Sequence, residues 1–153
     1  MQLTPSKINL FTAFNLPAAF FCGVRAKAIN SGQCIVSVKY SWISQNPFKS
    51  MYFAVQAMAA ELSTGALVLS QIKNSGKQIS MLVANSKSSF SKKATGRITF
   101  TCNDGKLLEE AIKKTIATGE GQTIWMKSIG VDQKGDQVSE FDFEWTLKVK
   151  LSK

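Results

Sequence analysis

One long stretch of the chain is almost free of charge. Between Lys49 and Lys73 the chain runs for 23 residues in which Glu61 is the single charged side chain. A helix that is apolar around its whole circumference either crosses a membrane or is enclosed by the rest of its own domain. A carboxylate inside such a helix is costly unless it is paired, protonated or directed into a polar cleft. The pattern therefore predicts a helix over residues 50–72 and makes Glu61 the first candidate for chemistry.

The composition of this segment argues against a membrane span, although a span needs only about 20 residues. Six polar side chains interrupt it: Gln56, Glu61, Ser63, Thr64, Ser70 and Gln71. A central acidic residue alone costs about 2.5–3.5 kcal/mol on insertion scales. The N-terminus also lacks the basic, apolar and small-residue regions of a signal peptide. We therefore expect a cytoplasmic protein without a membrane span, folded as a single domain over residues 1–153.

The chain has no histidine and three widely spaced cysteines, Cys22, Cys34 and Cys102. The lack of histidine excludes His-based triads, most zinc sites and haem ligation, so we expect no metal site and no bound cofactor. Odd-numbered, unclustered cysteines indicate reduced thiols that fill the core. Any catalysis must therefore use carboxylates, hydroxyls, thiols, lysines or backbone dipoles.

The chain is basic, with a net charge of +9 that comes from 17 lysines and two arginines against 10 acidic residues. Proteins that read nucleic acids usually depend on arginine for bidentate contacts, and no nucleic-acid-binding motif accompanies the charge here. Two other interpretations remain open. The lysines either form a solvated surface or attract an anionic ligand such as a phosphorylated cofactor.

The periodicity of apolar residues predicts the order of helices and strands. The expected helices cover residues 6–14, 50–72 and 106–118, and the expected strands cover residues 24–30, 33–42, 79–86, 96–102, 122–131 and 138–151. In the second strand Trp42 shares a face with Cys34 and Val36, and in the last strand apolar residues alternate strictly up to Leu151. Gly65 either weakens or ends the long helix or lets another backbone approach it. An antiparallel sheet wrapped around the apolar helix satisfies these patterns, which predicts an α+β fold.

Several short motifs occur along this order of helices and strands. They are Asn46 before the long helix, Ala60-Glu61 and Gly65 within it, Phe90-Ser-Lys-Lys-Ala94-Thr-Gly96 after it, and the turn from Val131-Asp132 to Gly135. With these motifs the chain resembles, from about Phe14 to its end, the hotdog-fold superfamily of acyl-CoA thioesterases and related dehydratases. Within it the chain resembles a thioesterase-like branch of uncharacterised bacterial proteins. The resemblance implies a hotdog fold, a homodimer or dimer of dimers with pockets at the subunit interface, and a small acyl thioester such as acyl-CoA as substrate.

One motif departs from this superfamily. Where active thioesterases carry His-Gly-Gly at the helix start, this chain has Tyr52-Phe53-Ala54. In those enzymes a glycine N–H, aided by the helix dipole, polarises the thioester carbonyl. Any residue other than proline supplies an N–H, so Phe53 and Ala54 remain candidates for the oxyanion site. Their side chains nevertheless occupy space that the glycines leave open.

The resemblance also suggests roles for individual side chains. It implies that Glu61 is the general base or nucleophile, and the alternative is a glutamate satisfied by a neighbouring hydroxyl, amide or lysine, or by a dimer contact. Asn46 either hydrogen-bonds the ligand or is a turn residue. Lys87, Lys92 and Lys93 either meet the phosphates of coenzyme A or form a solvated polar edge.

Three functions follow from these observations. The first is hydrolysis of an acyl-CoA or related thioester, with Glu61 activating water. The second is a non-catalytic module that binds acyl groups or acyl thioesters, which the missing His-Gly-Gly favours. The third, binding of nucleic acid through the basic surface, has the least support from the sequence because arginine is scarce.

Overall fold

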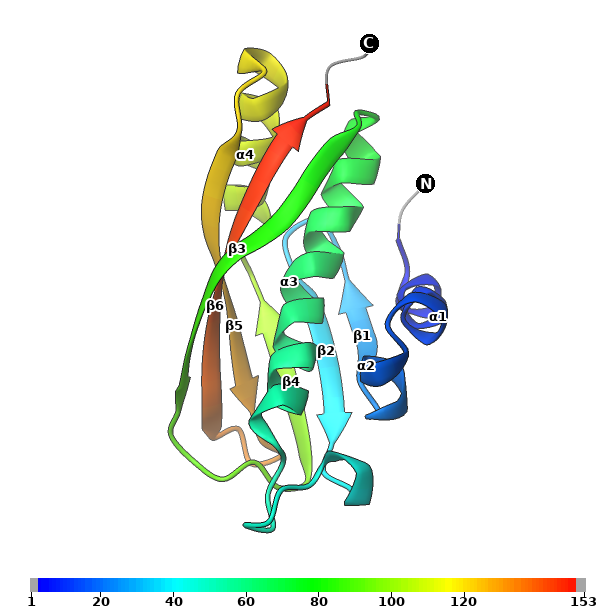
Figure 1. Ribbon diagram of the computed structural model, residues 1–153, viewed down its shortest axis with the longest axis vertical. Helices are drawn as coiled ribbons and strands as arrows, with labels where there is room; N and C mark the ends of the chain where they lie inside the picture. The colour runs from blue at the N-terminus through cyan, green and yellow to red at the C-terminus, as the bar shows by residue number, and fades with distance from the viewer. Residues whose placement is uncertain (1–2, 151–153) are drawn as a thin grey trace.

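An antiparallel sheet curves around one long helix, which lies along its concave side (Figure 1). The structure is a computed structural model and describes residues 3–150 of the chain. Its elements are α1 (Pro5–Asn15), α2 (Pro17–Phe21), β1 (Arg25–Ile29), β2 (Cys34–Lys39), the 3-10 turn η1 (Trp42–Ser44), α3 (Phe53–Ser75), β3 (Ile79–Phe90), β4 (Arg97–Cys102), α4 (Gly105–Thr118), β5 (Gln122–Val131) and β6 (Gln137–Val149). The six strands lie in the order β1-β2-β4-β5-β6-β3. The predicted α+β architecture, a sheet wrapped around the apolar helix, is therefore confirmed.

The long helix α3 forms the centre of the core. Of its most apolar 18-residue window, 67% is buried inside the fold, so its apolar composition is that of an enclosed core helix. Val55, Leu62 and Leu67 are among its buried residues. The helix ends at Gly76, whose φ of 66° is the left-handed conformation that commonly terminates helices.

Gly65 lies inside α3, so the alternative that it ends the helix is wrong. Its missing side chain serves close packing instead. A β-carbon at this position would lie 3.0 Å from Glu61 Oε1 and 3.3 Å from Trp145 Cζ2. The group that approaches is thus an indole ring from β6, where the sequence pattern suggested a backbone.

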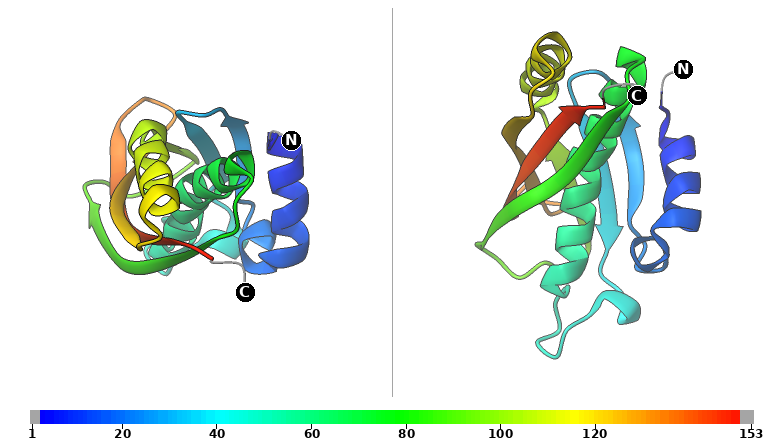
Figure 2. Two further views of the ribbon diagram at one scale, coloured as in Figure 1. Left: turned by 90° about the horizontal axis from the view of Figure 1, so that it is seen from above. Right: turned by 45° about the horizontal axis from the view of Figure 1, so that its top comes forward.

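The two outer strands of the sheet have different surroundings. Beside β1, α1 and α2 lie along the edge of the molecule, and the side chain of Asn9 donates from Nδ2 to Ala26 O (3.1 Å) and accepts at Oδ1 from Ala26 N (2.8 Å). At the other end β3 pairs with β6, and most of its residues are exposed. Figure 2 shows β3 crossing in front of α3 as an outermost strand.

Several predicted boundaries differ from the observed ones. The second strand ends at Lys39, and Trp42 lies in η1 with 83% of its surface exposed, so its predicted place on the core face is wrong. The cause is local: Ser44 Oγ accepts from the backbone N–H of Ser41 (2.9 Å), which favours a turn over a strand. The chain reaches α3 through a loop, and α3 therefore begins three residues later than predicted and ends at Ser75 instead of residue 72.

Other boundaries agree more closely. The strand predicted over residues 79–86 continues to Phe90, with an irregularity in its pairing between Val83 and Asn85. The last strand, predicted over residues 138–151, is β6, and Leu151 lies outside the described residues. Asp104 precedes α4, but its carboxylate makes no cap hydrogen bond and accepts from Lys127 N at 2.7 Å instead.

Candidate functional site

Glu61 lies on the side of α3 that faces the N-terminal helices. It borders a cavity of about 280 Å³, whose other lining residues are Asn15, Leu16, Pro17, Ala18, Ala19 and Met58. The junction between α1 and α2 therefore forms the wall opposite the carboxylate. Almost every lining side chain is apolar, so the carboxylate faces a confined space of low polarity.

The carboxylate of Glu61 is strongly desolvated. Burial raises the pKa of Glu61 above its ordinary value, and no neighbouring charge or hydrogen bond contributes to the shift. Among residues 3–150, the side-chain hydrogen bond that reaches Glu61 comes from Thr64 in the same helix and ends on the backbone carbonyl, so the carboxylate oxygens accept no hydrogen bond. A half-buried carboxyl group whose pKa is raised and whose oxygens accept no hydrogen bond within the described residues is a candidate proton acceptor.

Two residues that the sequence analysis did not single out for the site hold the helical turn of Glu61 in place. Trp145 Nε1 donates to Thr64 Oγ1 (3.0 Å), and Thr64 Oγ1 donates to the backbone carbonyl of Glu61 (3.0 Å). Both side-chain atoms are buried, and the Trp145 ring lies against Gly65. A tryptophan in the core-facing row of an alternating strand is visible in the sequence, but its partner 81 residues away is not.

A second cavity, of about 560 Å³, lies at the beginning of α3. Its lining includes the predicted site residues Asn46, Phe53, Lys92 and Lys93. Asn46 Oδ1 accepts from Phe48 N (2.9 Å) and Asn46 Nδ2 donates to Ser50 Oγ (3.1 Å). Its side chain therefore folds the loop that leads into α3, as the turn interpretation expects.

The first N–H groups of α3 are unused. The N–H groups of Val55 and Gln56 both donate to Tyr52 O, at 3.0 and 3.3 Å. Among the hydrogen bonds of residues 3–150 no acceptor is found for the N–H groups of Phe53 and Ala54. These donors lie at the positive end of the helix dipole. The Phe53 ring packs edge to face on Tyr52 and Phe90, so an aromatic wall stands beside them.

The three candidate lysines have different surroundings. Lys92 Nζ pairs with Asp132 and Asp136, each at 2.7 Å, and these hydrogen bonds raise its pKa. Lys93 Nζ donates to Phe48 O at 3.2 Å and borders the second cavity. Lys87 Nζ lies 4.5 Å above the ring of Trp125 and borders neither cavity. Lys93 is thus the lysine at this cavity whose charge is not already matched by a carboxylate.

The structure brings four of the predicted site residues to one cavity and places Glu61 at another. Ala54, Met58 and Glu61 are spaced at i, i+4 and i+7, so they lie on one face of α3. We call this row of half-buried residues the α3 stripe. Met58 and Glu61 line the first cavity, whereas Ala54 borders neither. Seven residues of helix span about 10 Å, which separates Ala54 from Glu61 along the axis.

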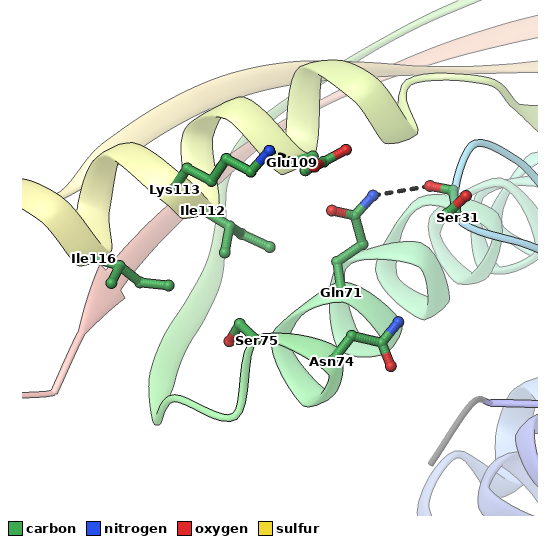
Figure 3. A pocket seen from close by; sticks show the side chains of 8 residues that line it. All are labelled: Ser31, Gln71, Asn74, Ser75, Glu109, Ile112, Lys113 and Ile116. Atoms are coloured by element: carbon green, nitrogen blue, oxygen red, sulfur yellow. Dashed lines mark hydrogen bonds and ion pairs between the residues drawn. The ribbon is translucent and has the colours of Figure 1, made fainter.

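A third cavity, of about 430 Å³, lies between α3 and α4 and contains none of the predicted site residues. Figure 3 shows Gln71 turned toward Ser31, with the ion pair of Glu109 and Lys113 on the facing helix. Gln71 Nε2 donates to the backbone carbonyls of Ser31 (2.9 Å) and Gly105 (2.7 Å). These groups bind each other, and the cavity has the character of a helix–helix junction.

The cysteines give no reactive centre. Cys34 and Cys102 face each other across β2 and β4, and burial raises the pKa of each thiol to about 12. Thiols with such pKa values stay protonated at neutral pH, which confirms the prediction that these two fill the core. Within residues 3–150 no three His, Cys, Asp or Glu side chains are grouped to hold a metal ion.

Comparisons with known proteins agree with this fold. The sequence model of the family described as "Domain of unknown function (DUF4442)" matches residues 7–147. A search of curated proteins finds no match. Among solved structures, a Pseudomonas aeruginosa protein of unknown function named "Probable Thioesterase" is 20% identical, with a TM-score of 0.86 over 98% of this chain and 99% of its own.

Two further structures are similar to the chain in fold. A mutant thioesterase from Pseudomonas aeruginosa is 12% identical, with a TM-score of 0.77 over 98% of this chain and 97% of its own. A thioesterase from Haemophilus influenzae is 9% identical, with a TM-score of 0.77 over 99% of this chain and 95% of its own. These likenesses confirm the predicted hotdog fold. At such low identity they show the fold alone.

Proposed function

The chain belongs to the DUF4442 family, and we propose that it hydrolyses an acyl-CoA or related acyl thioester with Glu61 as the base that activates water. The observation that carries this proposal is the state of Glu61. It is the one acidic residue among the first 103 of the chain. Its carboxylate faces an apolar cavity, and burial raises its pKa. A structural glutamate in this position would be expected to have a hydrogen-bonding partner.

The reaction uses groups that are present on the α3 stripe and at its N-terminal end. Glu61 removes a proton from water, and the resulting hydroxide attacks the thioester carbonyl carbon. Within one copy the first N–H groups of α3 lie about 10 Å from Glu61 along the helix, so the negative charge that develops on the carbonyl oxygen is stabilised by the unused N–H groups of Phe53 and Ala54 from the second copy of the dimer proposed below. When the C–S bond breaks, the leaving thiolate takes the proton from Glu61. The free acid and the thiol are released, and the carboxylate is regenerated.

The substrate's phosphates are assigned to the second cavity. Lys93 is our first candidate for this contact, because Lys92 already binds two carboxylates. Lys87 lies over Trp125 and would meet only an extended part of the ligand. Asn46 supports the site by holding the loop before α3. If the phosphates bind at the second cavity, the acyl group of the substrate would bind along the α3 stripe and in the Glu61 cavity.

We further propose that the site is completed in a homodimer, or in a dimer of dimers. The support is the open outer strand β3, most of whose residues are exposed. Leu82 on β3 is 66% exposed and Phe53 is 55% exposed, which leaves apolar surface for a second copy. A dimer would elute at twice the 16.7 kDa chain mass.

The free thiols of the described cysteines support a cytoplasmic location.

Release of free thiol from acyl-CoAs of short, medium, long and aromatic acyl groups tests the proposed hydrolysis. We expect Glu61→Gln to lower kcat by roughly 10²- to 10⁴-fold, the usual contribution of a general base. Glu110→Gln, which changes an exposed carboxyl group on α4, is the matched control and should keep the wild-type rate. Full activity in Glu61→Gln on a substrate that the wild type cleaves would refute the mechanism.

A non-catalytic acyl-binding module is the second candidate function. The side chains of Phe53 and Ala54, which stand where active thioesterases have glycine, favour it. A non-hydrolysable acyl-CoA analogue at a hundredfold excess over Kd would raise the free energy of unfolding by about 2.7 kcal/mol. Thermal protection without turnover would support this function. Absence of protection by every acyl ligand would exclude it.

A further inference from the structure

Helix α1 is apolar on two opposite faces. Ile8 and Thr12 are buried against the rest of the fold. On the other face, Leu10, Phe11 and Phe14 are 61%, 44% and 79% exposed. Because residues three or four apart share a helix face, these side chains form one stripe with Lys7. A stripe of this kind differs from the isolated apolar residues found on any protein surface and marks a site of interaction.

Helix α2 adds to this exposed apolar surface. Phe21 is 70% exposed, and Leu16, at the junction of the two helices, is 38% exposed. Figure 2 shows α1 and α2 side by side at the outer edge of the molecule, with no other element beyond them. We call this surface the N-terminal patch and define it as Lys7, Leu10, Phe11, Phe14, Leu16 and Phe21.

The segment of the chain that carries the patch has charges of one sign. Residues 1–60 contain five Lys or Arg residues and no acidic residue. Extending the count to residue 103 gives eleven basic residues and Glu61 as the one acid, whereas residues 104–153 hold eight basic and nine acidic residues. A cationic surface that carries exposed aromatic side chains attracts a partner that is anionic and also has an apolar part to contact these side chains.

An apolar groove lies directly beside the patch. It has a volume of about 290 Å³ and runs between α1 and α3, with Leu3, Ile8, Phe11, Leu62, Ala66 and Leu69 as its apolar lining. The remaining lining residues are Lys7 and Lys73, one from each helix, and both are exposed. An apolar channel with a cation on each side matches a lipid, whose acyl chain is apolar and whose headgroup phosphate is anionic.

We propose that α1 and α2 dock this protein onto the surface of an anionic lipid bilayer. Leu10, Phe14 and Phe21 enter the interfacial region, while Lys7 and Lys73 contact phosphate-bearing headgroups. A second copy of the chain fits the patch less well. A two-fold contact would bring the lysines of both copies together, and residues 1–60 hold no carboxylate to pair with them.

Co-sedimentation with lipid vesicles tests this proposal independently of any hydrolysis. The protein is expected to sediment with vesicles of phosphatidylcholine mixed with phosphatidylglycerol and not with vesicles of phosphatidylcholine alone. The double substitution Phe14→Ser/Phe21→Ser removes exposed side chains, so the fold is retained while binding falls at least tenfold. Leu107→Ser on α4, which is 43% exposed, is the matched control and should bind like the wild type.

The lysines supply a second readout. A basic residue near an anionic surface contributes about 1 kcal/mol, so Lys7→Gln and Lys73→Gln should each weaken binding about fivefold, and high salt should weaken binding of the wild type. Circular dichroism and gel filtration of each variant confirm that it is folded. The proposal is overturned if the wild type binds neither vesicle, or if the double variant binds like the wild type. It is also overturned if the double variant changes the oligomeric mass while the wild type ignores lipid, because the patch is then a contact between copies.

Discussion

The outer strands β1 and β3 form the two edges of the same sheet, but their backbones meet different neighbours. At the β1 edge the amide of Asn9 both donates to and accepts from Ala26, as a neighbouring strand would. At the β3 edge, 11 of the 12 residues of β3 pair with β6 on one side, and most of the side chains of β3 are exposed. Unpaired strand edges invite pairing with another chain. The comparison indicates that the β1 edge is covered by a helix of the same chain, and we call it the closed edge. The β3 edge is available to pair with a second copy, and we call it the open edge.

Each edge also has its own cavity. The Glu61 cavity is walled by the α1–α2 junction, which lies beside β1, whereas the second cavity is bordered by Phe90 at the end of β3 and by residues 91–94 after it. A second copy paired along β3 would join the opposite end of the strand order from β1 and would leave the N-terminal patch facing outward. The proposed dimer and the proposed bilayer contact are for this reason compatible with each other.

Proline in β3 tests the open edge and should have the largest effect. Neighbouring residues of an antiparallel strand direct their hydrogen-bonding groups to opposite sides, so one of Ser88 and Ser89 bonds β6 and the other points outward. Of the substitutions Ser88→Pro and Ser89→Pro, we expect the outward one to raise the dimer dissociation constant at least tenfold and lower turnover, with the midpoint of thermal unfolding unchanged. The inward one should destabilise the fold.

Light scattering coupled to gel filtration measures the mass, and thermal unfolding measures the stability of both variants. The two substitutions control each other, because they place the same residue type at adjacent exposed positions. If both leave the mass of the wild type unchanged, β3 is not the surface of association. The contrast between the two edges would then have no functional consequence.

Asn9→Ala tests the closed edge and should have a smaller effect. The substitution removes a donor and an acceptor from Ala26 together, and it leaves backbone groups of an edge strand without partners. We expect a loss of about 1–3 kcal/mol in the free energy of unfolding, measured by urea denaturation. Light scattering should also rise on storage, because the β1 edge becomes available for pairing.

Asn15→Ala is the matched control for this prediction. Asn15 Nδ2 donates to Phe11 O (3.0 Å) at an exposed position within α1, so it closes no strand. Its replacement should change the free energy of unfolding by no more than about 0.5 kcal/mol, as for other exposed sites. Equal losses in the two variants would show that Asn9 supports α1 and not the edge of the sheet.

The parts of the structure that the sequence predicted are those with a repeated local signal. The run with Glu61 as its one charge predicted α3, and strict alternation predicted β6 to within two residues at its described ends. The predicted bounds of β5 are the observed ones. The errors come from contacts between distant residues or from side chain–backbone bonds. The start of α3 shifted because Met51 N donates to Ala94 O (2.8 Å), which holds the preceding loop in place.

The same distinction applies to the candidate site. Glu61 stands out in the sequence because one charge in an apolar helix is unusual in any arrangement. Its cavity wall at Leu16 and Pro17, and the bond from Trp145 to Thr64, depend on how the chain returns to α3 in three dimensions. Likewise, the separation of Lys87 from Lys92 and Lys93 follows from the pleat and turn of β3, which spacing along the chain does not express.

The smallest expected effect concerns the pH dependence of stability. It tests Glu61, whose cavity lies at the β1 edge of the sheet. Because burial raises the pKa of Glu61 in the folded state, the native protein holds this proton more tightly than the unfolded chain does. Stability from this group is therefore fully present below the unfolded pKa and is lost as the pH rises through the folded pKa. Glu61→Gln removes the ionisation, so the variant should be more stable than the wild type at neutral pH and should lose this advantage in acid.

Urea denaturation of both proteins from acid to neutral pH measures this difference, with Glu110→Gln as an exposed control that should show no trend of this kind. A Glu61→Gln variant that is less stable than the wild type at neutral pH would mean that the ionised carboxylate has a partner in solution. That partner would come from a second copy, since the described residues of the chain offer the carboxylate no donor. The α1–α2 wall would then be part of the dimer contact, and the two edges of the sheet would share one function.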